Sequence, residues 1–197
     1  MKKIFFIFAL AAVPMAAQSW EIGAFVGQQT YDKFTAAGVE AKPESKVVSA
    51  VRIGYAVVDF GPTLLQVNAG AQLKSSSEVK FNGNAIGVKL DHQATSLGLA
   101  LIFKAGVFAS VGIDYRWDKL EGSFLGVNSS TTYGRPWLRG NIGYAFPTPV
   151  VKPFVGLEVA ETLSSKTVSD FGPSTDEEAL KGLAPKLQFG VYFGIRF

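Results

Sequence analysis

The residues best suited to chemistry in this chain surround its single histidine. His92 follows Asp91, and Ser96 stands four residues further on. A serine hydroxyl, an imidazole and a carboxylate are the nucleophile, general base and orienting acid of an acyl-ester hydrolase. The competing interpretation, which we favour, is an exposed loop histidine without a catalytic role. One His in a chain without Cys also argues against a zinc site, and we expect no metal and no cofactor.

A second set of candidates consists of charged side chains within otherwise apolar segments: Glu21, Arg52, Asp114, Arg116, Arg139, Glu158 and Arg196. Charges removed from water must pair. Arg139 and Glu158 are equally far from a predicted turn near 148–149, so we expect them to be close cross-strand partners. Glu21 and Arg196 lie near the two ends of the mature chain and are neighbours if the first and last strands pair.

The segments that carry these charges alternate in polarity with a period of two. In the last segment, large apolar residues from Leu187 to Phe197 alternate with small or polar ones such as Gln188, Gly190 and Arg196. The pattern recurs in eight segments of about ten residues, the length that a tilted strand needs to cross a membrane. They lie at 20–29, 47–57, 63–74, 97–104, 107–117, 137–146, 153–160 and 187–197. The pattern predicts an all-β fold, an eight-stranded antiparallel up-and-down transmembrane β-barrel.

The connections between these segments alternate in length, as in outer-membrane barrels. Those near 59–62, 104–106 and 146–149 are short, whereas those at about 30–46, 75–96, 118–136 and 161–186 are long. Within the second long connection, Asn82-Gly83 predicts a type I′ hairpin turn. Ile86, Val88 and Leu90 are even-numbered, whereas the apolar residues from Leu97 onward are odd-numbered. We therefore expect a one-residue slip, such as a bulge, within 91–96.

Aromatic residues gather near the predicted strand ends, as two interfacial girdles would require. Trp20, Tyr55, Phe103, Tyr144, Phe146 and Phe197 fall near the short turns. Tyr115, Trp117 and Tyr133 fall near the long loops.

The first 19 residues have the pattern of an export signal. Lys2 and Lys3 precede an apolar run, and Ala17-Gln18-Ser19 offers small residues for cleavage. We expect a cleaved signal peptide over 1–19 and a barrel domain over 20–197, with cleavage after Ala17 or an uncleaved anchor helix as the alternatives. The formal net charge of +3 includes both lysines, and no clustered basic stripe suggests nucleic acid.

The mature chain resembles the family of small outer-membrane barrels that includes the OmpA transmembrane domain, OmpX and OmpW. The resemblance rests on the signal segment, on Lys152-Pro153-Phe154-Val155-Gly156 and on the final strand ending at Phe197. It implies a bacterial outer-membrane location, lipid as a partner, and recognition of Phe197 by the barrel-assembly machinery.

Four functional hypotheses follow for such a barrel. The first is a structural or interaction protein with long surface loops, which could bind extracellular ligands, and a lumen plugged by the charged residues. The second is a narrow pore or small-molecule channel gated by lumen salt bridges. The third is a lipid acyl-ester hydrolase, although Ser96 lies at i+4 and not at the i+2 spacing of deacylase-like barrels. The fourth is a soluble lipocalin-type barrel with its apolar face inward. We favour the first, and expect a monomer that is not an enzyme.

Overall fold

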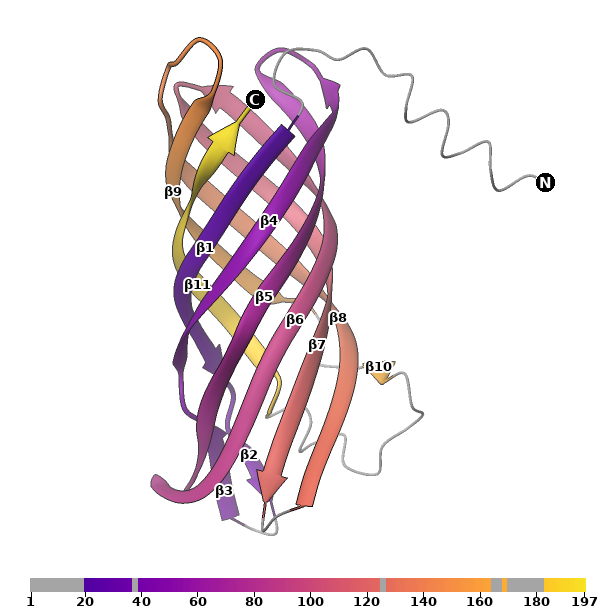
Figure 1. Cartoon of the computed structure of the whole chain (residues 1–197), viewed down its shortest axis with the longest axis vertical. Helices are drawn as coiled ribbons and strands as arrows, with labels where there is room; N and C mark the ends of the chain where they lie inside the picture. Colours follow the sequence, from indigo (N-terminus) through magenta and orange to yellow (C-terminus); the bar gives the residue numbers. More distant parts are fainter. Residues whose placement is uncertain (1–19, 37–38, 125–126, 164–167, 170–182) are drawn as a thin grey trace, which may run out of the picture.

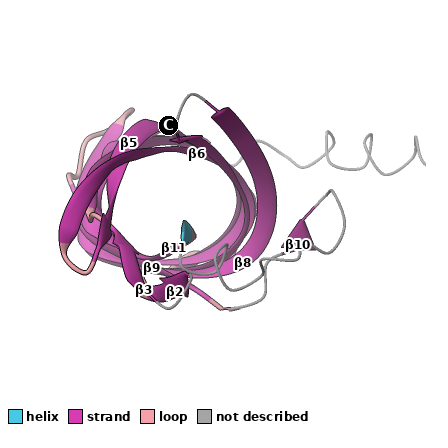
Figure 2. Cartoon of the chain, turned by 90° about the horizontal axis from the view of Figure 1, so that it is seen from below, coloured by secondary structure: helices cyan, strands magenta, loops and turns pink. Residues whose placement is uncertain are grey.

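The computed structural model describes residues 20–36, 39–124, 127–163, 168–169 and 183–197, so the segment predicted as a signal peptide lies outside the described residues. Eight long antiparallel strands form a barrel (Figure 1), and pairing of the first with the last closes it into the ring seen along the axis in Figure 2. The predicted fold is therefore confirmed. The strands are β1 (Trp20–Tyr31), β4 (Lys46–Asp59), β5 (Thr63–Phe81), β6 (Asn84–Ala105), β7 (Val107–Phe124), β8 (Val127–Ala145), β9 (Lys152–Thr162) and β11 (Pro185–Arg196).

The large apolar side chains of these strands point outward. Leu99, Ile113 and Leu157 are each more than half exposed, although they lie in the middle of their strands. The hypothesis of a lipocalin-type barrel is wrong, because that barrel would bury these residues around a ligand. An apolar belt of this extent is suited to lipid rather than to water. No helix among the described residues is long and apolar enough to cross a membrane.

Aromatic pairs mark both edges of the apolar belt. Near the short turns, the ring centroids of Trp20 and Tyr55 are 4.9 Å apart. At the other edge, the rings of Tyr115 and Trp117 are 5.0 Å apart and face outward. Tyr133 does not belong to this girdle as predicted. It is fully buried and points inward.

The connections are short at one end, whereas strands continue at the other. Gly61 and Gly106 have positive φ values in the short turns, as tight reversals require. Two of the predicted long loops are continuations of the β5–β6 and β7–β8 hairpins. Asn82 and Gly83 have φ values of 46° and 82°, which fit the predicted type I′ turn. The short strands β2 (Phe34–Ala36), β3 (Val39–Pro43) and β10 (Val168–Ser169) also lie at this end.

The predicted slip within 91–96 is confirmed in position but not in strand. The β5–β6 register shifts by one residue between the pairs Gln72–Ala94 and Ser75–His92, and again between Glu78 and Lys80, but the extra residue at the first shift is on β5. Strand β6 itself is regular and pairs with β7 from Lys89 to Ala105 without interruption. The apolar residues of β6 move from its outer face to its inner face because the strand leaves the lipid-facing belt. Within the belt, the odd-numbered residues of β6 face outward, but beyond Trp117 the outside is water and the apolar residues face inward. These residues form a small core of Ala41, Val79, Leu90, Leu120, Tyr133 and Ala184.

Candidate functional site

The charged residues of the lumen form three layers, which we call lower, middle and upper, counted from the short-turn end of the barrel. The lower layer lies near the short turns. Glu21 and Arg196 are opposite each other in the β1–β11 pair, as expected if the barrel closes. Arg196 Nε donates to Glu21 Oε2 at 2.6 Å, and the hydroxyl of Tyr192 donates to Glu21 Oε1 at 2.6 Å. The Arg196 guanidinium also lies 4.7 Å from the ring centroids of both Phe108 and Phe154. Arg196 is thus fixed by its partners on several sides.

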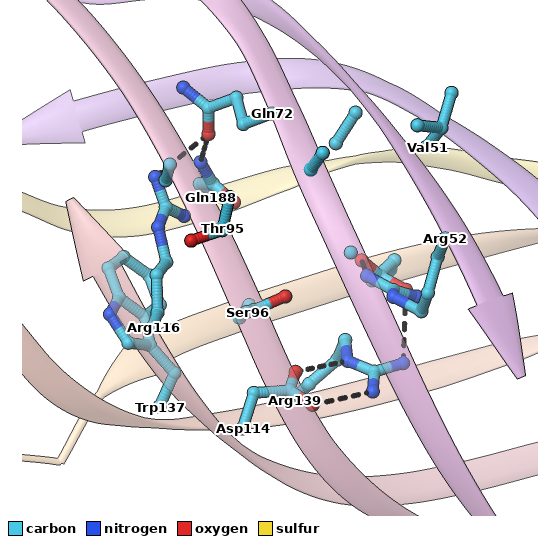
Figure 3. Close-up of a pocket in the computed structure, with 16 residues that line it drawn as sticks. Val51, Arg52, Gln72, Thr95, Ser96, Asp114, Arg116, Trp137, Arg139 and Gln188 are labelled. Carbon is cyan, nitrogen blue, oxygen red and sulfur yellow. Dashed lines mark hydrogen bonds and ion pairs between the residues drawn. The ribbon is translucent and has the colours of Figure 1, made fainter. Parts of the chain in front are cut away.

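The middle layer consists of two bidentate ion pairs, shown in part in Figure 3. Arg52 donates to both oxygens of Glu158 at 2.8 and 2.9 Å. Arg139 donates to both oxygens of Asp114 at 2.8 and 3.0 Å. Arg139 and Glu158 lie close together, with Nη1 3.8 Å from Oε2, but they are not each other's main partner. The register explains the difference, since Asn141 and not Arg139 stands opposite Glu158.

The upper layer is centred on His92, which is 1% exposed. The interpretation of His92 as an exposed loop residue is therefore wrong. Its Nε2 lies 2.7 Å from Asp118 Oδ1, while its Nδ1 lies 3.1 Å from Gln29 Nε2 and 2.9 Å from Gln72 Nε2. Because an amide nitrogen can only donate, Nδ1 is the acceptor and the ring proton belongs on Nε2.

Arg116 and Gln188 complete the upper layer. Arg116 Nε donates to Asp118 Oδ1 at 2.8 Å, and its Nη2 donates to Gln72 Oε1 at 2.8 Å. Gln188 donates to the same oxygen of Gln72 at 2.7 Å, as Figure 3 shows. All the charged residues predicted as lumen residues thus point inward and belong to one of the three layers.

Some lumen residues escaped the sequence analysis. Gln72 and Gln188 lie in predicted strands at inward positions, so the alternation could have identified them. Asp118 and Arg135 are buried as well, but they lie just beyond the predicted strand ends at 117 and 137. The continuation of β7 and β8 past the apolar belt places them in the lumen.

The residues of the hydrolase hypothesis are not assembled. Ser96 is on the same inward face of β6 as His92, but four residues of strand separate their Cα atoms by about 13 Å. Ser96 stands opposite Gly70 and Arg116, and no hydrogen bond joins it to His92. Asp91 is on the opposite face, where Lys74 Nζ lies 2.9 Å from its Oδ2. The described residues contain no cluster of His, Cys, Asp and Glu that could hold a metal.

A small cavity separates the middle layer from the upper one (Figure 3). It measures about 50 Å³ and is lined by Arg52, Gln72, Ser96, Asp114, Arg116 and Arg139 among others. About 10–15 Å³ of such space is enough to hold one water molecule, so the cavity has room for about three to five. The space that the paired charges leave open at this depth is therefore small.

A separate charge network lies on the outer surface, beyond the aromatic girdle and outside the membrane-spanning part of the strands. Lys74 Nζ contacts both Asp91 and Glu121. The hydrogen bond from Lys74 holds the pKa of the Asp91 carboxyl below its usual value. The hydrogen bond from Lys119, followed by that from Lys74, lowers the pKa of the Glu121 carboxyl. This network ties β5, β6 and β7 together above the belt.

Comparisons with known proteins show which solved structures share this fold. No family model matches the chain, and no curated protein matches it. OprG from Pseudomonas aeruginosa shares 13% identity at a TM-score of 0.56, over 91% of this chain and 94% of that protein. A major outer-membrane protein from Thermus thermophilus shares 13% identity at a TM-score of 0.56, over 92% and 100% of the two chains.

A third similar structure is the attachment invasion locus protein Ail of Yersinia pestis, solved with the heparin analogue sucrose octasulfate. It shares 12% identity at a TM-score of 0.50, and the match covers 92% of this chain and all of Ail. At these identities the likeness concerns the fold alone. The chain has the fold of the small outer-membrane β-barrel proteins.

Proposed function

We propose that this chain is an outer-membrane barrel with a structural and interaction role and a closed lumen. The middle layer carries the proposal, because both of its carboxylates are held by bidentate guanidinium contacts at a depth where the remaining cavity is about 50 Å³. Charge-assisted bidentate pairs are the strong and directional class of hydrogen bonds. Opening a water path would require these pairs to separate.

The proposed interaction surface is the strand extension beyond the Tyr115–Trp117 girdle. In outer-membrane barrels, the short turns face the periplasm and the long connections face outward. The β5–β6 and β7–β8 hairpins would then stand outside the cell as stiff walls and could present ligands with a fixed surface. Ail has this fold and binds a sulfated sugar analogue, although a shared fold does not establish a shared ligand.

The proposal includes the partners expected from the sequence. Lipid would cover the apolar belt, and the assembly machinery would recognise the last strand, which ends at Phe197. We propose a monomer, exported through the signal segment, that binds no nucleic acid and is not an enzyme. The separation of His92 from Ser96 supports the last point.

A gated narrow pore is the second candidate. One observation favours it: Arg139 lies 3.8 Å from Glu158 while it is bonded to Asp114. A small rotation of Arg139 would exchange one carboxylate for the other. A channel of this kind would switch between two pairings of the same residues.

Conductance of the refolded protein in a planar lipid bilayer separates these candidates. A change in gel mobility on boiling would first show that the barrel is folded. We expect no single-channel steps from the wild-type protein. Reproducible steps would overturn the closed lumen and favour the pore, and Asp114→Ala would then change the open probability because Arg139 loses its present partner.

A further inference from the structure

The short-turn end of the barrel contains a cavity that the three lumen layers do not fill. It measures about 200 Å³, and Lys104, Phe108, Phe146, Lys152 and Arg196 contribute to its lining. The three cationic residues come from β6, β9 and β11 respectively. Strands far apart in the sequence thus direct positive charge to one place at the mouth of the barrel.

Arg196 is oriented toward this cavity before any ligand arrives. It is 6% exposed, Phe108 and Phe154 pack against its guanidinium, and its Nε is bonded to Glu21. Its two Nη atoms make no hydrogen bond with the described residues. The edge that remains available to the cavity is therefore the one that carries both Nη atoms. A planar guanidinium edge of this kind fits an oxyanion.

The side-chain carboxylates near this mouth are both bonded to other cations. Glu21 is bonded to Arg196, and Asp59 Oδ2 lies 2.9 Å from Lys104 Nζ. Lys152 has no ion-pair partner among the described residues. The Lys152 ammonium can therefore pair with an anion in the cavity.

The rim of the cavity adds an apolar side. Val107 and Phe146 line it and are 55% and 45% exposed on the outer surface of the barrel. Between Lys104 and Val107 the chain turns through Gly106, which has no side chain to separate the lumen mouth from the outer surface. A ligand with an anionic group and an acyl chain could contact both sides at once.

We propose that this mouth binds the phosphate group of an anionic phospholipid, with the lipid chains beside Val107 and Phe146. The inference rests on the proposed function, which puts the short-turn end at the periplasmic leaflet. Arg196 and Lys152 contact the phosphate, and Lys104 adds charge while it remains paired with Asp59. Because Lys152 has no carboxylate partner among the described residues, we expect the site to select anionic over zwitterionic headgroups.

Native mass spectrometry of the folded barrel in a neutral detergent tests the proposal. The probes are short-chain phosphatidylglycerol, phosphatidylcholine of the same chain length, and inorganic phosphate. We expect a phosphatidylglycerol adduct that Lys152→Gln weakens about three- to tenfold. Lys89→Gln, which removes the same charge at the far end of the barrel, leaves the adduct unchanged. Arg196→Lys keeps the charge but removes the guanidinium fork, and we expect it to weaken the adduct as well.

Three outcomes would overturn the proposal. The first is equal binding by the wild type and Lys152→Gln, and the second is equal affinity for phosphatidylcholine. The third is that inorganic phosphate binds as tightly as the lipid, which would show that the site binds a free anion rather than a phospholipid. Failure here would appear in the adducts, whereas failure of the closed lumen would appear as conductance, so the two results are distinguishable.

Discussion

At the scale of single residues, Glu158 is the side chain on which the middle layer depends. It accepts both hydrogen bonds from Arg52, another from Asn141, and lies near Arg139. Removing one member of a buried ion pair costs about 3–5 kcal/mol, because the partner charge stays buried. We therefore expect Glu158→Gln to lower the free energy of unfolding in lipid vesicles by about that amount, measured by urea titration.

Glu121→Gln is the matched control for this prediction. Glu121 is paired with lysines on the exposed outer surface, where an ion pair contributes about 0–1 kcal/mol. If both substitutions shift the urea midpoint equally, the lumen pairs do not hold the barrel closed.

His92 provides a second test at this scale, on the placement of one proton. The two amide donors at Nδ1 require the proton on Nε2, directed at Asp118. Nitrogen-15 chemical shifts of the single imidazole should report this tautomer. A proton on Nδ1 would show that the two glutamine amides point the other way.

Single residues also show what the sequence could and could not predict about the lumen. The alternation of polar and apolar residues correctly predicted that the side chains of Arg52, Asp114 and Glu158 point inward. The alternation could not predict which residues form ion pairs, because that depends on the register between strands. The register expected from the turn put Arg139 opposite Glu158, whereas the structure, shifted by two residues, puts Asn141 there. His92 was missed because Leu90 and Leu97 suggested opposite faces for one continuous strand.

At the scale of elements, the hairpin turn at Asn82-Gly83 controls the β5–β6 extension. Gly83 has a φ of 82°, a conformation that costs an L residue such as Ala about 1 kcal/mol or more. Because no neighbour lies near its missing Cβ, Gly83→Ala tests the backbone alone. We expect faster amide hydrogen exchange in the hairpin beyond Ser76, with no change in the apolar belt. Faster exchange throughout the barrel would mean that the extension is not a separate unit.

The outer charge network predicts how this extension responds to acid. The pKa values of Asp91 and Glu121 are lowered from 3.8 and 4.5 by bonded lysines. The two ionised carboxylates therefore stabilise the extension fully at pH values above 3.8 and 4.5. It is lost as the pH falls through the lowered values. We expect constant protection factors in the β5–β6 extension between about pH 8 and 5, and a decrease at more acidic pH. In Lys74→Gln, this acid-dependent decrease should be smaller, and an unchanged decrease would assign it to other groups.

Elements were predicted well within the apolar belt and poorly beyond it. Every strand segment of the belt showed alternation, because one face meets lipid and the other meets the lumen. Beyond Trp117, the apolar residues of β6 and β7 face inward and the outer face becomes polar, so the pattern is inverted although the β6–β7 register does not shift. A search for strands with an apolar outer face therefore assigns these continuing strands to loops.

At the scale of the whole molecule, the aromatic girdles and the inversion of polarity define where the bilayer lies. On β6, Phe103 stands at the short-turn edge and Thr95 stands opposite Trp117 at the other edge. Leu99 is halfway between them and is 53% exposed. These three positions measure depth along one strand.

This depth scale leads to a prediction for the barrel in lipid. An arginine at the bilayer midplane costs a transmembrane barrel about 2–4 kcal/mol, but only about 0–1 kcal/mol near an interface. We therefore expect Leu99→Arg to lower the free energy of unfolding in lipid vesicles by about 2–4 kcal/mol, and Thr95→Arg by less than about 1 kcal/mol. Both side chains face outward, so neither substitution alters the lumen. Equal costs at the two positions would contradict the bilayer position, because only a membrane makes the outer surface of one strand differ so strongly with depth.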